Sequence, residues 1–369
     1  MGIQIAVYTL FIVFYFVFNN NTNRNRKWYI IACSLVIMLK IALRSVTIGS
    51  DTVHYAYYFY ESIETPWSEL LSAFSTRYES IAGDIDYGYY VLQKVFSTFI
   101  TDFNLFTFCI QGIFFFLPLG ILIYRNSNSQ QQVLFAYTLL NALFLGLPMA
   151  NARQVYAIGL CICSFIFLLE KKYIMTAIFI ILGFLIHASA LIFALPVALS
   201  FMGTKSLKTI SIVALILFFF VLNYTNEIIL FMANFIGMDK YTSYGEGEIR
   251  GGATTYIVLS LLLCVFCLYG FFKAKMLPDR IKKWFVMLPL TTFFVPLIYS
   301  NGSMMRITLY FQIYFLLLIP FTIDILYKKR DQKIIYFALI AILIYMSVSS
   351  SIEYKFFWEE SQETIMYWK

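Results

Sequence analysis

Three arginines stand at the ends of apolar segments and are the side chains best placed for chemistry in this sequence. Arg44, Arg153 and Arg306 come from separate parts of the chain. A guanidinium group binds a phosphate through two parallel hydrogen bonds, so three of them at one level would suit a polyanionic head group. The alternative is that each pairs with an acid such as Asp51, or extends to lipid phosphate. Both interpretations fit the spacing.

Two histidines and a group of tyrosines are the next candidates. His187 interrupts a long apolar run, where it serves either as a packing residue or as a general base or the partner of one. His54 stands beside the tyrosines of segment 55–60 and is expected to lie at the membrane surface. These tyrosines, Tyr55 among them, either stack on sugar rings or form an aromatic belt.

Composition places these residues on helices inside a membrane. The chain has 369 residues, of which 61% are hydrophobic and 13% are charged, whereas a soluble domain has about 25% charged residues. Apolar runs of about the 17–25 residues that a spanning helix needs recur along the chain. Runs such as 210–222 do not alternate as barrel strands would. We therefore predict an all-α polytopic membrane protein with one transmembrane domain, residues 1–369.

Hydropathy separates the predicted spans, and one of them is unusual. Segment 173–201 is long for one crossing and short for two, and charge decides between them. A single crossing would put Lys205 and Lys208 outside and the acidic loop 224–252 inside, so we predict that the segment turns back near His187 as a short re-entrant hairpin. The total is then about 11–12 membrane helices. The apolar segments are 3–18, 28–46, 103–124, 133–149, 153–169, 173–201, 209–223, 253–272, 284–299, 306–326 and 334–350.

Charge decides the orientation. With the hairpin in place, six loops on one side hold 17 of the 27 Lys and Arg residues but 3 of the 20 Asp and Glu residues. The positive-inside rule puts these loops in the cytoplasm and both termini outside.

The opposite, outer side then becomes the substrate face. It contains the loops 47–102 and 224–252, and the three arginines and His187 gather there. Within the first loop, segment 86–101 predicts an amphipathic helix at the interface. Lys40, four residues before Arg44, is expected on the same helix face, turned toward the bundle.

Five short motifs, in order over about residues 40–315 and hence most of the chain, resemble those of the EpsG family of Wzy-type polysaccharide polymerases. In the second motif Asp86 stands where the family more often has Glu. The motifs are Arg44 with Ile48-Gly49-Ser50-Asp51-Thr52 and Tyr55; Asp86-Tyr87-Gly88-Tyr89; Asn151-Ala152-Arg153-Gln154; His187-Ala188-Ser189-Ala190; and Met305-Arg306 with Tyr310-Phe311.

The resemblance implies a glycosyltransferase-type polymerase. It would join oligosaccharide repeat units carried on undecaprenyl pyrophosphate at the outer face of the bacterial cytoplasmic membrane, with the arginines stabilising the leaving group. His187 is the first choice for the base that deprotonates the acceptor hydroxyl, and Asp51 the second. The residues implied in pyrophosphate and substrate binding are Arg44, Arg153, Arg306, Gln154, Tyr55, Tyr310 and Lys40.

The implied partners are the lipid-linked oligosaccharides, the lipid bilayer and, as a candidate, a chain-length regulator. No cofactor, metal or nucleic acid is expected. A flippase or transporter for lipid-linked sugars is one alternative, and it would carry charges along a transmembrane path. A membrane O-acyltransferase is the other, and it would need functional residues on the inner side as well. Whether the product is O-antigen, capsule or exopolysaccharide stays open.

Overall fold

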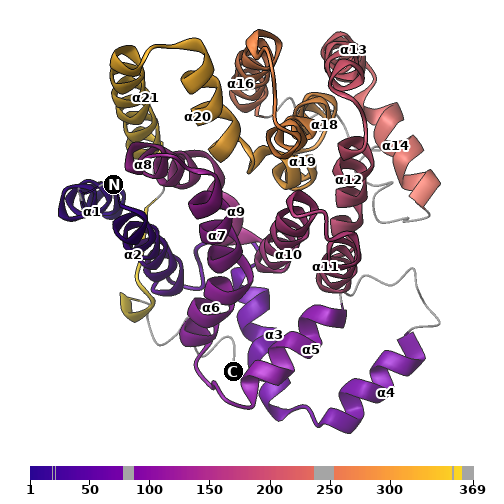
Figure 1. The fold of residues 1–369 in the computed structure, drawn as a ribbon. Coiled ribbons are helices and arrows are strands. Elements are labelled where there is room, and N and C mark those ends of the chain that lie inside the picture. Colours follow the sequence, from indigo (N-terminus) through magenta and orange to yellow (C-terminus); the bar gives the residue numbers. More distant parts are fainter. Residues whose placement is uncertain (19, 21, 78–86, 237–252, 351–352, 360–369) are drawn as a thin grey trace.

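The computed structural model is a bundle of helices (Figure 1). Within the part of the chain that it describes there is no strand, apart from an isolated bridge between Arg44 and Phe356. The prediction of an all-α polytopic membrane protein is confirmed. Asp86 and the 237–252 part of the expected loop 224–252 lie outside the described residues. The structure describes the whole chain except residues 19, 21, 78–86, 237–252, 351–352 and 360–369.

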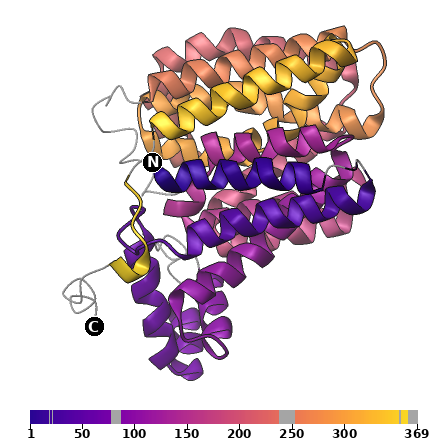
Figure 2. The same cartoon turned by 90° about the vertical axis from the view of Figure 1, so that its left-hand side faces the viewer.

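Long helices run side by side through the bundle (Figure 2). Several of the spans contain a π-helical or 3₁₀ section, written η. In chain order the bundle consists of α1 (Gly2–Val17), α2 (Asn23–Ala42), α6 (Phe103–Gln111), η1 (Gly112–Phe116), α7 (Leu117–Asn126), α8 (Gln130–Leu139), η2 (Leu140–Phe144), α9 (Gly146–Ala150), α10 (Ala152–Leu169), α11 (Tyr173–Ile186), η3 (Ala188–Phe193), α12 (Ala194–Ser200), α13 (Thr204–Asn223), α16 (Thr254–Lys273), α17 (Asp279–Lys282), η5 (Lys283–Val286), α18 (Met287–Phe294), η6 (Val295–Tyr299), η7 (Gly302–Met304), α19 (Met305–Gln312), α20 (Phe315–Leu326) and α21 (Lys329–Ser349).

The predicted apolar segments are all helical, but they differ in length. Among the described residues, six helices are long and apolar enough to cross a membrane alone, and a seventh span is possible if η7–α19 and α20, bent by 55°, count as one. This is fewer than the about 11–12 expected from hydropathy. Hydropathy identifies an apolar segment whether or not its backbone forms one continuous helix. The count from the structure requires a continuous helix that is long enough to cross the membrane. Three shorter apolar helices, α1 and the two arms of the hairpin, account for part of the difference.

Segment 173–201 folds back on itself, as predicted. Helix α11 ends at His187, whose backbone is extended, with φ −158° and ψ 119°. The chain then returns through η3 and α12. Tyr173 at the start of the segment meets Phe201 at its end, with ring centroids 5.4 Å apart. The hairpin is confirmed, and His187 lies at its tip.

The N-terminus and the last described residues, 353–359, lie at the same end of the bundle (Figure 2). Near the N-terminus, Gln4 Oε1 accepts a hydrogen bond of 2.7 Å from Lys40 Nζ, one turn before Arg44. Near the C-terminus, Lys355 O accepts one of 2.8 Å from Ser45 N. Both segments therefore lie at the end of the bundle where α2 finishes, as the charge pattern predicted for the termini.

The expected outer loop 47–102 is mostly helical. Three peripheral helices lie at one edge of the bundle (Figure 1). The third of them covers the segment 86–101 that was predicted to be an amphipathic helix. The first and third pack through Tyr55 and Tyr89, edge to face with ring centroids 5.5 Å apart. The helices of the two expected loops are α3 (Thr52–Glu64), α4 (Trp67–Arg77), α5 (Tyr87–Ser97) and α14 (Thr225–Ile236).

Candidate active site

A large cavity of about 650 Å³ lies between the peripheral helices and the starts of α10 and α19. Acidic, cationic and tyrosine side chains all line this cavity. Of the residues singled out from the sequence, it brings together Arg153, Arg306, Asp51 and Tyr55. The lining residues are Asp51, His54, Tyr55, Tyr58, Glu61, Ser62, Thr65, Glu69, Leu70, Tyr87, Tyr89, Tyr90, Lys94, Arg153 and Arg306.

One face of α3 supplies much of this wall. Positions three and four apart share a helix face, and α3 is oriented so that one such stripe points into the cavity. Tyr57 and Tyr60 on the same helix are not among the lining residues and are each 50% exposed. The stripe consists of His54, Tyr55, Tyr58, Glu61, Ser62 and Thr65.

Arg306 and Asp51 form an ion pair in the cavity, with Nη2 and Oδ2 3.3 Å apart. The two side chains are 36% and 31% exposed, so the pair is open to solvent. A pair as open as this contributes no more than about 1 kcal/mol. A ligand with two negative charges can therefore replace Asp51 as the partner of Arg306.

Arg153 lies at the start of α10, with its guanidinium carbon 5.7 Å from the centre of the Tyr55 ring. Burial raises the pKa of Tyr55, and the positive charge of Arg153 opposes part of that rise. Tyr55 is therefore a neutral phenol at physiological pH, able to donate a hydrogen bond. A guanidinium above a tyrosine ring beside a second guanidinium gives the cavity an anion-binding corner.

Four groups able to accept a proton line the same cavity: Asp51, His54, Glu61 and Glu69. His187 is not among the lining residues. The sequence interpretation treated His54 as an ordinary surface residue, whereas the structure puts it in the cavity wall. Its spacing from Tyr55, Tyr58 and Glu61 on one helical stripe is the signal that could have identified it.

Arg44 does not line the cavity, because its guanidinium binds the loop that precedes α3. Nη2 donates to Thr52 Oγ1 at 3.1 Å and to Met149 O at 3.0 Å, and Nε donates to Ile48 O at 3.2 Å. Gly49 in this loop has φ +100°, and a Cβ there would lie 2.1 Å from Met149 O. The Arg-Gly-Thr part of the first motif therefore packs the loop against the end of α9 and so positions Asp51.

Lys40 also lies away from the cavity. It is 5% exposed and faces the bundle interior, as predicted. Its Nζ donates to Gln4 Oε1 at 2.7 Å and to Asn141 Oδ1 at 3.1 Å. A buried cation needs such partners to offset lost hydration. Lys40 therefore joins α1, α2 and η2 in this structure.

Gln154 and Tyr310 lie behind the arginine corner. Gln154 Nε2 donates to the backbone oxygen of Arg306, which ties α10 to α19. The hydroxyls of Tyr310 and Ser189 are 3.0 Å apart and tie α19 to the hairpin. These contacts hold Arg306 in place without adding groups to the cavity wall.

The hairpin tip supports the cavity through Gly88. A Cβ on Gly88 would lie 2.3 Å from Leu185 O, two residues before His187. Only a glycine allows α5 to approach the tip this closely. The second motif thus places Tyr89 and Tyr90 in the cavity wall, and the hairpin acts as the surface on which α5 rests.

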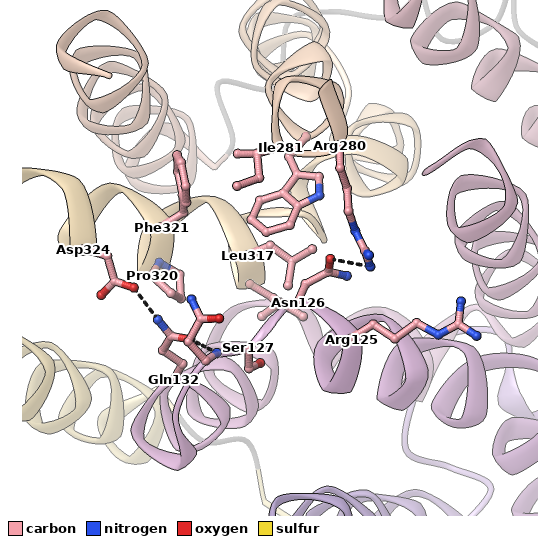
Figure 3. A pocket seen from close by; sticks show the side chains of 13 residues that line it. Arg125, Asn126, Ser127, Gln132, Arg280, Ile281, Leu317, Pro320, Phe321 and Asp324 are labelled. Atoms are coloured by element: carbon pink, nitrogen blue, oxygen red, sulfur yellow. Dashed lines mark hydrogen bonds between the residues drawn. The ribbon is translucent and has the colours of Figure 1, made fainter. Parts of the chain in front are cut away.

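A small cavity of about 220 Å³ lies at the other end of the bundle (Figure 3). Arg280 Nη2 donates to Asn126 Oδ1 at 3.1 Å, and Gln132 Nε2 donates to Asp324 Oδ2 at 2.7 Å. Arg125 lines it as well and pairs with Glu170. The polar side chains here bind their near neighbours, and apolar ones such as Phe321 fill the rest of the wall.

Metal ligands do not gather in either place. Across the described residues, no three His, Cys, Asp or Glu side chains come close enough to hold a metal ion.

Comparison with known proteins gives one informative match. No individually curated protein and no solved structure shows significant similarity to the chain. The sequence profile of the EpsG family matches residues 27–367. This range includes every residue that lines the large cavity and all helices of the bundle from α6 to α21. The chain belongs to the EpsG family.

Proposed function

We propose that this protein is a polysaccharide polymerase that joins oligosaccharide repeat units carried on undecaprenyl pyrophosphate. The family is associated with glycosyltransferase-like polymerases, and that broad role is the starting point. The observation that supports the proposal most strongly is the large cavity, where Arg153 and Arg306 lie beside carboxylates and five tyrosines. Guanidinium groups suit a pyrophosphate, and tyrosine rings suit sugar faces.

In the proposed reaction the arginines act on the leaving group. The acceptor hydroxyl oxygen forms a bond to the anomeric carbon of the donor as the bond from that carbon to the pyrophosphate oxygen breaks. Arg153 and Arg306 stabilise the negative charge that develops on the pyrophosphate. Because the donor already carries a pyrophosphate leaving group, the reaction needs no nucleotide.

The proton of the acceptor hydroxyl goes to a base in the cavity, and we propose Asp51 for this role. Asp51 pairs with Arg306, with Oδ2 and Nη2 3.3 Å apart. Pyrophosphate binding to Arg306 would free the carboxylate at the moment when a base is needed. His187, preferred from the sequence, is proposed instead to position α5 through the hairpin tip, since it does not line the cavity.

The orientation of the bundle supports a reaction at the outer face of a bacterial cytoplasmic membrane. The loops at the end of the bundle opposite the large cavity carry most of the Lys and Arg residues, which indicates the cytoplasmic side. The acceptor, donor and product would then all be on the outer side, where the lipid-linked units are exposed.

The test is the glycolipid profile of cells that lack the gene, complemented with wild-type or variant protein. Single lipid-linked units on the outer leaflet, with no long polymer, would support the proposal. Single units on the inner leaflet would mean a flippase instead. Polymer of normal length that lacks only an acyl substituent would mean an acyltransferase.

A further inference from the structure

A groove of about 290 Å³ adjoins the large cavity, and Arg306 lines both. One side of the groove is formed by η2 and α9, and the other by η7 and α19. Its lining residues are Leu143, Phe144, Gly146, Asn151, Gly302, Ser303, Met305, Arg306 and Leu309.

The groove and the large cavity differ in chemistry. Four large apolar side chains, Leu143, Phe144, Met305 and Leu309, line the groove, and Arg306 supplies its charge. The large cavity instead has acids, cations and phenol groups. Passing from the large cavity to the groove, the wall therefore changes from acids, cations and phenol groups to the Arg306 guanidinium, and then to the four apolar side chains with Asn151 and Ser303 beside them.

We propose that the groove binds the isoprene units of the lipid carrier nearest to the pyrophosphate. This inference rests on the proposed function and names where the substrate's lipid enters. A polyprenyl-linked glycan has a polar glycan, a charged pyrophosphate and an apolar chain in that linear order. The same order is found in the large cavity, Arg306 and the groove. Isoprene units gain free energy by leaving water for an apolar wall, about 25 cal/mol per Å² buried.

Two glycines make the groove testable. A Cβ on Gly146 or Gly302 would meet no atom within 4 Å, so a larger side chain at either position extends into open space. Gly146→Phe and Gly302→Phe should thus fill the groove with little strain on the fold. Gly203, between the hairpin and α13, is similarly open and gives the matched control Gly203→Phe.

The probe is polyprenyl pyrophosphate without a sugar, carrying a photoreactive diazirine in the isoprene unit next to the phosphate. With wild-type protein in nanodiscs, the cross-link should map to peptides that contain Leu143 or Leu309. Gly302→Phe should lower the yield about tenfold, which corresponds to ~1.4 kcal/mol. Gly203→Phe should leave the yield unchanged.

Cross-links outside the groove, or a yield that Gly302→Phe leaves unchanged, would overturn the inference. A parallel assay with sugar-bearing donor and acceptor separates this result from the proposed function. If the wild-type protein makes polymer but the probe reacts elsewhere, the groove assignment fails alone. If the probe reacts in the groove but no polymer forms, chain binding stands and the polymerase proposal fails.

Discussion

Cationic side chains form different kinds of ion pair at the two ends of the bundle. At the end with the small cavity, Arg125 and Lys172 pair with Glu170, and Lys282 pairs with Asp279 three residues before it. At the end with the large cavity, Arg306 pairs with Asp51, 255 positions away in sequence. Arg125 and Glu170 join the ends of α7 and α10, and Lys282 and Asp279 lie within α17, whereas Arg306 and Asp51 join two distant segments around the large cavity.

This difference separates cations that serve membrane orientation from those that form a site. A charge in a loop is satisfied by water and a nearby acid, and its position within the loop hardly matters. Arg153 and Arg306 instead line a cavity rich in acids and tyrosines, where the packing of several helices sets their positions. We therefore expect substitutions of Arg306 and Arg153 to alter the reaction, and those at the small-cavity end to change little.

The largest effect should come from Arg306→Ala. Loss of one guanidinium from the leaving-group site should slow polymerisation about 10²–10³-fold, the usual cost of removing a charge-stabilising donor. Arg125→Ala at the other end is the matched control and should polymerise normally. Polymer formation from purified lipid-linked units measures both. Equal losses of polymerisation rate in the two variants would contradict the proposed difference between the two ends of the bundle.

Arg153→Lys tests whether charge alone is enough. Lysine keeps the positive charge but cannot form two parallel hydrogen bonds to a phosphate, so we expect a rate loss of about 10–100-fold. Membrane insertion should be normal. Gel analysis of polymer length, beside an immunoblot of the membrane fraction, gives the answer. Full activity would assign Arg153 to packing or topology.

Gly49→Ala tests the loop that Arg44 packs against α9. The new methyl group would lie 2.1 Å from Met149 O, at a φ of +100° that alanine disfavours. We expect a loss of about 1–3 kcal/mol in stability, and a lower rate because Asp51 shifts with the loop. Thermal unfolding in detergent measures the first effect. Gly203→Ala, at an open position, should match the wild type.

Tyr354→Phe tests the attachment of the C-terminal segment to α2. Tyr354 donates a hydrogen bond of 2.6 Å to Lys40 O, and burial raises its pKa to about 12, so it remains a donor at physiological pH. Removing the hydroxyl should cost about 0.5–1.5 kcal/mol. Unfolding temperature is the measurement, and an unchanged value would mean that the segment adds nothing to the stability of this end.

The smallest effect is expected for Glu170→Gln at the small-cavity end. Hydrogen bonds from Lys172 and Arg125 lower the pKa of Glu170, so the carboxylate stabilises the folded state at neutral pH and that stabilisation is lost as the pH falls. The pairs are exposed, so the loss should be below about 1 kcal/mol. Unfolding curves of both proteins should converge in acid. A difference that grows as the pH falls would contradict the pairing.

Much of the architecture could be predicted from sequence. The apolar helical segments, the hairpin with His187 at its tip and the position of the N-terminus and residues 353–359 at one end all follow from hydropathy and charge, although fewer helices than expected are long enough to span. These properties depend on each segment's own composition, because every span meets the same lipid and every loop the same water. The helix in segment 86–101 was likewise visible in its own apolar spacing.

Much of the site depended on contacts between segments. Arg44, Arg153 and Arg306 stand alike at the ends of apolar segments, yet Arg44 binds Met149 O and the other two line the cavity. For the same reason His54 lines the cavity, whereas His187, at the hairpin tip as predicted, is not among its lining residues.

The sequence by itself therefore determined the class of protein, its apolar helical segments, its family motifs and the end of the bundle at which these motifs lie. Only the tertiary structure decided which motif residues meet in the cavity and which hold its walls. The physical reason is that lipid and water act on each segment separately. A guanidinium's partner, by contrast, depends on which distant backbone or carboxylate the packing brings within hydrogen-bonding distance.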